Sequence, residues 1–227
     1  MTEERSGAGE GDELVSVFTH ELKTPIAAVQ GLAATLARSL HDLDHAAAVQ
    51  IAEAIERSAR HLGELVRSFA DARALEAGGL ALHPEPTVLA GLVRETVEEL
   101  QPLLAGRPVA LELDERAAPT VDPVRIRQVL TNLLSNAARY TPPGSPLEVT
   151  LSRTSGGVEL AVRDHGPGIA PAEAERMFER HTRLSHGVPG SGLGLYVSRG
   201  LARAHGGDLV ALQPQGAGAL LVLRLPL

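Results

Sequence analysis

The chain has 227 residues, of which 44% are hydrophobic and only 2% aromatic, so its core must be built mainly from Leu, Val, Ile and Ala. The formal net charge of −7 argues against a nucleic-acid-binding protein, which needs a basic face to neutralise phosphates. The absence of cysteine excludes disulfides and thiolate metal sites, and it is compatible with a reducing compartment.

No membrane segment is visible in the sequence. No apolar run approaches the roughly 20 residues that a transmembrane helix needs. Residues 1–12 are polar and contain glycine, without the apolar stretch of a signal peptide. We therefore expect a soluble chain whose first twelve residues form a flexible N-terminal segment. A membrane span or a sensor of a parent protein would lie outside this sequence.

Two long helices are predicted for residues 13–40 and 46–75, with a short polar connector between them. In the first helix, apolar residues recur every seven positions from Val15 onward, and further apolar positions widen the stripe. In the second, apolar spacings of four and three alternate. Two such helices form an antiparallel hairpin, which has too little core to stand alone. We expect two copies to pair into a four-helix bundle.

The pattern changes after Gly78 and Gly79, which end the second helix. We place a domain boundary there, between a helical hairpin at 13–77 and a mixed domain at 80–227. The elements predicted for the second domain are helices at 88–104, 123–140 (with Asp122 as N-cap), 172–180 and 191–205, and strands at 109–113, 147–151, 158–162, 208–212 and 220–225.

The first motif whose residues could take part in a reaction is FTHELKTP, residues 18–25. The apolar stripe places His20 on the opposite, solvent-facing side of its helix. Taken alone, this is equally well an ordinary surface histidine. An exposed imidazole with a pKa of ~6.5 is mostly neutral at pH 7, so one ring nitrogen can attack a phosphate donor. The neighbouring carboxylate of Glu21 can then take the other ring proton.

The second motif is RIRQVLTNLLSNAARYT, residues 125–141. Asn132, Asn136 and Tyr140 are spaced four apart and share one helix face, with Arg139 beside them. They could simply be the polar face of a solvated helix. Asparagine is a poor helix former, however, so two of them in mid-helix call for another reason. An amide oxygen can complete the shell of Mg²⁺ beside phosphates and waters, and a tyrosine can lie against a purine.

Two glycine-bearing motifs follow. DHGPGI, residues 164–169, ends a strand, and its carboxylate can accept a hydrogen bond from an exocyclic amine. GSGLGL, residues 190–195, leads into a helix whose first N–H groups can bind phosphates. Each string is a weak signal alone. The second does not follow a strand, which counts against a dinucleotide-binding Rossmann unit.

In their order and spacing, these motifs resemble the successive boxes of sensor histidine kinases, together with FERHTR (178–183) and HGGD (205–208). The resemblance covers residues 13–227. It implies an α-helical hairpin that forms a dimeric four-helix bundle, followed by an α/β sandwich ATP-binding domain of the Bergerat type, with a mixed sheet backed by helices. It implies a protein-histidine kinase of a two-component system, which uses ATP to phosphorylate itself and then an aspartate of a response regulator.

For the hairpin, the resemblance implies that His20 is the phosphoacceptor and Glu21 its proton acceptor. Thr24 matches the position that, with Glu21, serves the reverse activity, in which water removes phosphate from the partner's aspartate. The implied partners are a second copy of the chain and the receiver domain of a response regulator, with no nucleic acid. The implied location is the cytoplasm, either free or as part of a membrane-bound sensor.

For the second domain, the resemblance implies binding of ATP with Mg²⁺. Asn136 matches the magnesium-binding asparagine, and Asn132 the one a turn earlier. Arg139 matches a phosphate-contacting cation, Tyr140 an adenine-facing aromatic, and Asp164 the adenine-reading carboxylate. The segment 165–190 matches the ATP lid. Further implied nucleotide-binding residues are Gly166, Gly168, Arg180, Gly190, Gly192, Leu193 and Gly194.

Some departures and alternatives remain. The family usually has Lys in place of Arg139, and aromatics in place of His181 and Thr182, which puts the packing of the lid in doubt. A gyrase-type ATPase shares the nucleotide fold but needs a glutamate where Asn132 stands, and it gives the hairpin no role. A non-catalytic scaffold is disfavoured because the expected polar residues are present. Glu21 and Thr24 leave the balance between kinase and phosphatase activity open.

Overall fold

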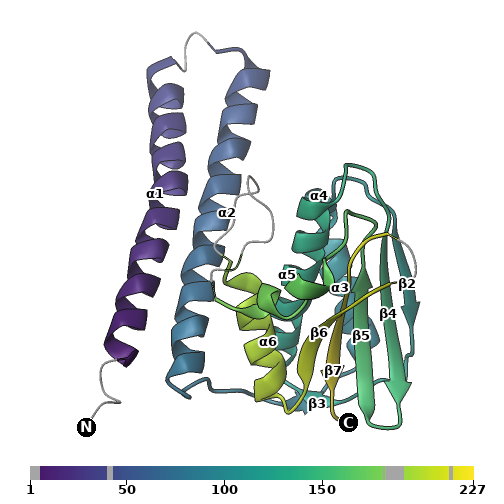
Figure 1. Ribbon diagram of the computed structural model, residues 1–227. Coiled ribbons are helices and arrows are strands. Elements are labelled where there is room, and N and C mark those ends of the chain that lie inside the picture. Colours follow the sequence, from purple (N-terminus) through teal and green to yellow (C-terminus); the bar gives the residue numbers. More distant parts are fainter. Residues whose placement is uncertain (1–5, 40–42, 181, 183–191, 215–216) are drawn as a thin grey trace. The chain divides into compact units, whose positions relative to one another are not determined.

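The computed structural model describes residues 6–39, 43–180, 182, 192–214 and 217–227, with side chains from Phe18 onward except that of His20. The chain divides into two compact units, residues 1–73 and residues 74–227. Figure 1 labels the helices and strands of both units.

The first unit is the predicted helical hairpin. Its helices are α1 (Ser6–Ser39) and α2 (His45–Glu76). The last residues of α2, from Ala74 onward, belong to the second unit. Asp44 caps the start of α2, as its carboxylate accepts from the N–H of Ala47 at 2.7 Å. The rings of Phe18 and Phe69 stack between the two helices, with centroids 3.9 Å apart. Helix α1 begins inside the segment that we expected to be flexible.

The second unit contains a five-stranded mixed sheet with the strand order β2-β4-β5-β7-β6. Strand β2 pairs with β4 in parallel, and the other neighbours are antiparallel. The strands are β2 (Val109–Leu113), β4 (Leu147–Thr154), β5 (Gly157–Arg163), β6 (Asp208–Leu212) and β7 (Leu220–Leu225). These bounds confirm the strands expected from the alternation of apolar residues, although β4 runs three residues further than expected, to Thr154.

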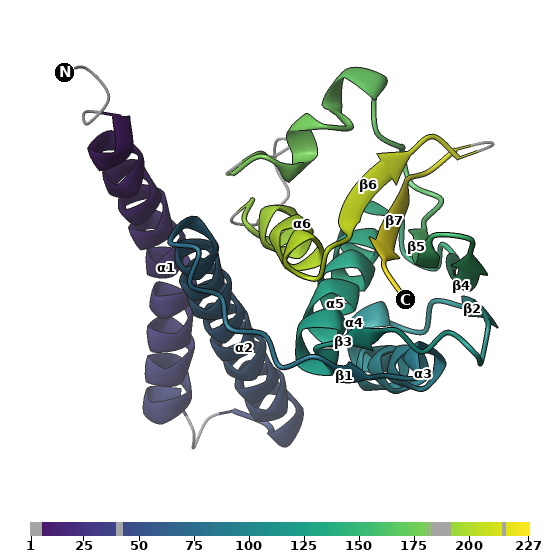
Figure 2. The same ribbon diagram turned by 90° about the horizontal axis from the view of Figure 1, so that it is seen from below.

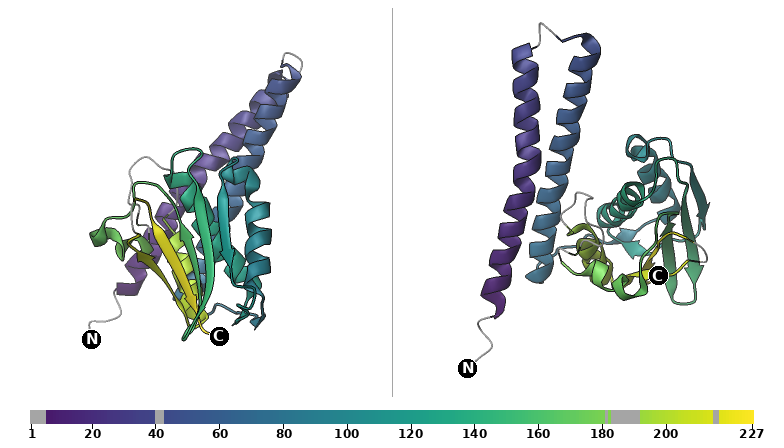
Figure 3. Two further views of the ribbon diagram at one scale, coloured as in Figure 1. Left: turned by 90° about the vertical axis from the view of Figure 1, so that its right-hand side faces the viewer. Right: turned by 45° about the horizontal axis from the view of Figure 1, so that its top comes forward.

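Within this unit, helices lie on one face of the sheet (Figures 2 and 3), and none of the unit's described helices covers the other face. The helices are α3 (Leu89–Glu99), α4 (Gln101–Leu104), α5 (Pro123–Tyr140) and α6 (Gly194–Ala204). The covered face carries the core: Leu147, Val149 and Leu151 of β4 are buried. The other face is mixed: it carries the pair of Arg224 and Glu159 across β7 and β5, 2.9 Å apart, next to Ala161 and Val222. The expected α/β sandwich is therefore confirmed.

Three local features differ from the expectations. The helix expected over 88–104 is broken at Leu100 into α3 and α4, because Pro102 has no N–H to donate to the carbonyl of Glu98, four residues before it. The expected helix near 172–180 is two short 3₁₀ turns, η1 (Pro171–Glu173) and η2 (Arg176–Phe178). A two-stranded sheet of β1 (Glu85–Pro86) and β3 (Thr120–Val121) was not predicted, since two-residue strands are too short to show a period.

Candidate functional site

The FTHELKTP motif lies entirely within α1. The side chain of His20 is outside the described part of the chain, so its predicted exposure stays a prediction. Glu21 is half-buried, and Thr24, four residues after His20, is exposed. Pro25 lies inside the helix and has no N–H to give to the carbonyl of Glu21. The backbone next to His20 therefore has a carbonyl without its usual intrahelical donor.

Helix α5 starts as the sequence predicts, with Asp122 as N-cap and Pro123 in the first turn. Oδ1 of Asp122 accepts from the N–H groups of Val124 at 3.0 Å and Arg125 at 3.2 Å, and Oδ2 accepts from that of His83 at 3.0 Å. Burial alone would raise the pKa of Asp122, but these backbone donors outweigh it and hold the pKa below its ordinary value. The start of α5 is thus firmly anchored.

The two asparagines of α5 differ in their surroundings. Nδ2 of Asn132 donates to the carbonyl of Gly194 at 3.2 Å and to Oγ of the fully buried Ser198 at 3.1 Å. Asn132 therefore ties α5 to the first turn of α6. Asn136 is half-buried, and its amide has no hydrogen-bond partner among the described residues. A half-buried amide without a protein partner is available to a ligand.

The C-terminal end of α5 carries two more polar side chains of this kind. Arg139 is exposed, and Tyr140 is 37% exposed. Neither makes a hydrogen bond or ion pair within the described part of the chain. Since Asn136 and Tyr140 are four residues apart and Arg139 adjoins them, the last turns of α5 present three unengaged polar groups together.

Asp164 lies directly after β5, beside this helix end. Its Oδ1 accepts from the backbone N–H groups of Gly166 at 2.9 Å and Ala219 at 3.0 Å. Its own N–H donates to the carbonyl of Ala219 at 2.9 Å. Among the described residues Oδ2 has no partner. The carboxylate is therefore held by one oxygen, while the other is open to a ligand.

Two glycines allow the loop that carries Asp164 to lie close to the end of α5 and to the turn before β7. A Cβ on Gly166 would lie 3.0 Å from Cγ2 of Thr141 and 3.1 Å from the carbonyl oxygen of Tyr140. A Cβ on Gly218, whose φ is +108°, would lie 1.8 Å from the carbonyl oxygen of Asp164. The DHGPGI motif points to Gly166, but no motif points to Gly218 and Ala219, whose only signal in the sequence is the glycine-rich turn before β7.

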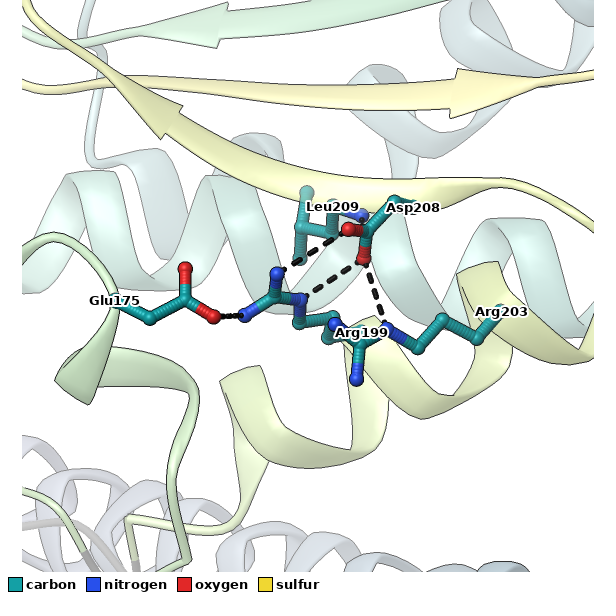
Figure 4. Close-up of polar contacts among 5 residues, drawn as sticks. All are labelled: Glu175, Arg199, Arg203, Asp208 and Leu209. Atoms are coloured by element: carbon teal, nitrogen blue, oxygen red, sulfur yellow. Dashed lines mark hydrogen bonds and ion pairs between the residues drawn. The ribbon is translucent and has the colours of Figure 1, made fainter.

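The segment that follows DHGPGI is fastened by a charged cluster (Figure 4). Arg199 of α6 pairs with Glu175 and with Oδ1 of Asp208 at 2.9 Å, and its guanidinium lies 4.8 Å from the ring centre of Phe178. Arg203 adds a contact to Asp208 at 3.2 Å. The hydrogen bond from Arg199 lowers the pKa of Asp208 to about 2. The same bond raises the pKa of Arg199.

The HGGD motif has a structural explanation. Nε2 of His205 accepts from the backbone N–H of Asp122 at 3.0 Å, and its Nδ1 lies 2.7 Å from the carbonyl of Leu201. Because a backbone N–H can only donate, Nε2 carries no proton, and Nδ1–H is the donor to Leu201. The ring thus joins the end of α6 to the start of α5. Asp208, the last residue of the motif, belongs to the charged cluster.

The remaining predicted residues surround the lid segment. Gly168 has a φ of +82° and Gly192 a φ of +65°. Leu193 is 1% exposed and precedes α6, which Gly194 begins. Arg180 forms an ion pair with Glu76. Gly190 and His181 lie outside the described residues.

The donor set indicates what kind of ligand this site can hold. The described residues contain no group of three or more His, Cys, Asp or Glu that could hold a metal ion. A cation at Asn136 would therefore take most of its oxygen ligands from elsewhere, which suits Mg²⁺ held together with phosphates and water.

In the part of the chain that is described, no helix is long and apolar enough to cross a membrane.

Comparison with family models matches both parts of the chain. Residues 12–78 match the His Kinase A (phospho-acceptor) domain. Residues 121–227 match the histidine kinase-, DNA gyrase B- and HSP90-like ATPase family.

Curated relatives match over nearly all of this chain. The adaptive-response sensory kinase SasA of Synechococcus sp. (strain JA-2-3B'a(2-13)) is 32% identical over 222 residues, 95% of this chain and 59% of SasA. The sensor protein TorS of Escherichia coli (strain K12) is 35% identical over 94% of this chain and 24% of TorS. The chain thus spans less than two thirds of the length of these relatives.

Solved structures agree with this relationship. Full-length ShkA, crystallised in complex with AMPPNP, has a TM-score of 0.68 and 28% identity, over 95% of this chain and 45% of ShkA. The Acinetobacter baumannii histidine kinase AdeS shares the fold, with a TM-score of 0.70 and 24% identity over 91% of this chain and 97% of AdeS. With a phosphoacceptor hairpin followed by the ATPase fold, in the order found in these kinases, the chain belongs to the sensor histidine kinases and comprises their catalytic core.

Proposed function

We propose that this chain transfers the γ-phosphoryl group of ATP to His20 and then to an aspartate of a response regulator. The observation that carries the nucleotide site is the group of unengaged polar atoms at the end of α5. Asn136, Arg139, Tyr140 and Oδ2 of Asp164 have no partner among the described residues, whereas the side-chain nitrogen of Asn132 close by donates two hydrogen bonds. Polar side chains that lie close together and have no protein partner are suited to bind a ligand.

Each of these groups has a proposed role in binding ATP. Oδ2 of Asp164 accepts from the exocyclic amine of adenine, and Tyr140 lies against the base. Arg139 contacts a phosphate, and the amide oxygen of Asn136 binds Mg²⁺. When bound, Mg²⁺ neutralises charge on the phosphates, which lowers the barrier to phosphoryl transfer. The glycines Gly166, Gly168, Gly190, Gly192 and Gly194 let the lid backbone approach the nucleotide, next to Leu193 and Arg180.

The transfer itself needs little from the protein except position and proton handling. A neutral imidazole of His20 attacks the γ-phosphorus with one ring nitrogen, and ADP leaves. Glu21 takes the proton from the other ring nitrogen, so the ring remains neutral in the phosphorylated state. Thr24, one turn further along α1, is exposed and is proposed to orient water for removal of phosphate from the regulator.

Hydrolysis of ATP as the main activity is less well supported. A gyrase-type reaction requires a carboxylate where Asn132 stands, to orient water. Here the side-chain nitrogen of Asn132 is bound to Gly194 and Ser198 of α6. Residue 132 therefore acts as a structural link between two helices.

The proposal extends to the organisation of the protein. We propose two domains, residues 13–77 and 80–227, and a homodimer formed through the hairpin, which leaves apolar residues such as Ile26 and Val66 exposed at 39% and 48% in one copy. The proposed partner is a receiver domain, and the proposed location is the cytoplasm, where ATP is found.

Incubation with γ-labelled ATP and Mg²⁺ tests the proposal. We expect label that is lost in acid and kept in base, as for a nitrogen–phosphorus bond. His20→Gln should take up no label while it binds ATP like the parent. Equal labelling of His20→Gln and the parent would refute His20 as the acceptor, and failure of the parent to bind ATP would refute the nucleotide site.

A further inference from the structure

Arg107 is a buried cation whose contacts all lie at one end of α5. Only 7% of the surface of Arg107 is exposed to solvent. Nη1 donates to Oγ1 of Thr141 at 2.8 Å and to the carbonyl of Pro142 at 2.6 Å. Nη2 donates to the carbonyls of Ala138 at 2.8 Å and Thr141 at 3.1 Å. Among the described residues no carboxylate pairs with this guanidinium. A buried charge without a counter-ion is costly, so this placement calls for an explanation.

The end of α5 supplies the compensation. The last carbonyls of a helix have no intrahelical donors and carry the negative end of the helix dipole. The planar guanidinium binds three carbonyls and a hydroxyl there at once, a geometry that a lysine ammonium cannot reproduce. The chain enters this position through two successive left-handed residues, Ala105 with φ +51° and Gly106 with φ +73°. A left-handed alanine is itself unfavourable, so the surrounding structure maintains it.

From Arg107, hydrogen bonds and closely spaced neighbours lead to the proposed adenine-reading group. Oγ1 of Thr141 accepts from Arg107 and donates to the carbonyl of Ala137 at 2.7 Å. A Cβ placed on Gly166 would lie 3.0 Å from the methyl group of Thr141 and 3.2 Å from Oδ1 of Asp164. That same oxygen accepts from the N–H of Gly166 at 2.9 Å. Thr141 also directly follows Tyr140, so residue 141 adjoins both the aromatic residue and the loop that carries Asp164.

We propose that Arg107 is a positioning residue for the nucleotide base: it fixes the end of α5 against the loop that carries Asp164. The proposal rests on the proposed binding of ATP to this site. Arg107 touches no reacting atom. Its loss should therefore weaken recognition of adenine while leaving the rate of phosphoryl transfer at saturating ATP nearly unchanged.

The test uses the full 227-residue chain with Arg107→Met, the milder Arg107→Lys, and the control Arg94→Met. Arg94 is a surface arginine that pairs with Glu115 and contacts none of these residues. We expect the Kd for ATP to rise about tenfold in Arg107→Met and less in Arg107→Lys, as for loss of a charge-assisted hydrogen bond. The Kd for GTP should change much less, so that selectivity for ATP falls. Arg94→Met should match the parent.

Thr141→Val tests the same connection from the other side, because it keeps the side-chain shape but removes the hydroxyl. It should also weaken ATP binding, and its effect should be smaller when Arg107 has already been replaced.

The outcomes separate the two proposals. A parent chain that binds no ATP refutes the proposed function and the role of Arg107 with it. A folded Arg107→Lys variant with the ATP affinity and selectivity of the parent refutes the role of Arg107 alone. A third outcome is that Arg107→Lys or Thr141→Val lowers folding stability and raises the Kd for ATP and the Kd for GTP by the same factor. In that case Arg107 is only structural and the proposal is wrong.

Discussion

In the hairpin, few described side chains are buried, whereas the second unit has a continuous core. Within residues 1–73 the buried apolar side chains among those described are Pro25, Leu65 and Ala72. Within residues 74–227, β4, β5, β6 and β7 and the helices α3, α5 and α6 all contribute buried apolar side chains. A hairpin whose apolar face is exposed to water gains little stability from hydrophobic burial until a second copy covers that face. The first unit is therefore expected to depend on association, and the second to fold by itself.

The largest expected effect comes from cutting the chain between the two parts. Residues 1–77 should dimerise, and residues 80–227 should be monomeric and bind ATP. Mixed at micromolar concentration, they should label His20 roughly 1,000-fold more slowly than the intact chain, because the linker supplies an effective concentration on the order of millimolar. Sedimentation and labelling kinetics check this. A monomeric first fragment, or a mixture as fast as the intact chain, would contradict it.

A second experiment separates two activities within the hairpin. Thr24→Ala should keep the parental rate of self-phosphorylation, because Thr24 is proposed to orient water rather than the ring of His20. It should slow removal of phosphate from the cognate receiver about 100-fold, the usual scale for loss of orientation at a reacting centre. The phosphorylated receiver is followed after ATP has been removed. Unchanged dephosphorylation would show that Thr24 has no such role.

The third comparison uses the two asparagines of α5, which sit one helical turn apart. Asn132→Ala should lower the free energy of unfolding by about 1–3 kcal/mol, because it leaves the buried hydroxyl of Ser198 without this donor. Asn136→Ala should change stability by less than about 0.5 kcal/mol and abolish most binding of Mg·ATP. Both tyrosines of the chain lie in residues 74–227 and there is no tryptophan, so tyrosine fluorescence in urea reports on the second unit alone. Equal loss of stability in both variants would remove the distinction.

The smallest expected effect concerns Asp208 and pH. Its pKa is about 2 in the folded protein, mainly because of Arg199, and ~3.9 in an unfolded chain. The carboxylate therefore contributes stability above about pH 4, and the contribution is lost as the pH falls towards 2. Because the side chain is 33% exposed, solvent screening reduces its worth to about 1 kcal/mol. Asp208→Asn should be less stable than the parent by that amount at pH 7, with the difference vanishing near pH 2. A difference that persists in acid would assign it to packing.

Most of the fold was predictable from local patterns. The seven-residue stripe of α1, the Asp122 cap and the alternating residues of β4 each express a rule that operates within a few neighbours. The site was predictable only in part. That Asn132 and Asn136 share a helix face follows from their spacing, but their different duties depend on Gly194 and Ser198, more than sixty residues away. Arg107 belongs to no motif, and nothing in its neighbours indicates that it reaches the far end of α5.

The geometry of His205 also limits where phosphate can be found on this protein. One ring nitrogen receives a backbone N–H and the other donates to a carbonyl, so the imidazole has no free lone pair to offer an electrophile. Reagents that acylate or alkylate histidine should leave it intact for as long as α5 and α6 stay folded. Of the two histidines in the motifs FTHELKTP and HGGD, only His20 can then accept a phosphoryl group. Peptide mapping of the labelled protein should find no label on the peptide that contains residue 205.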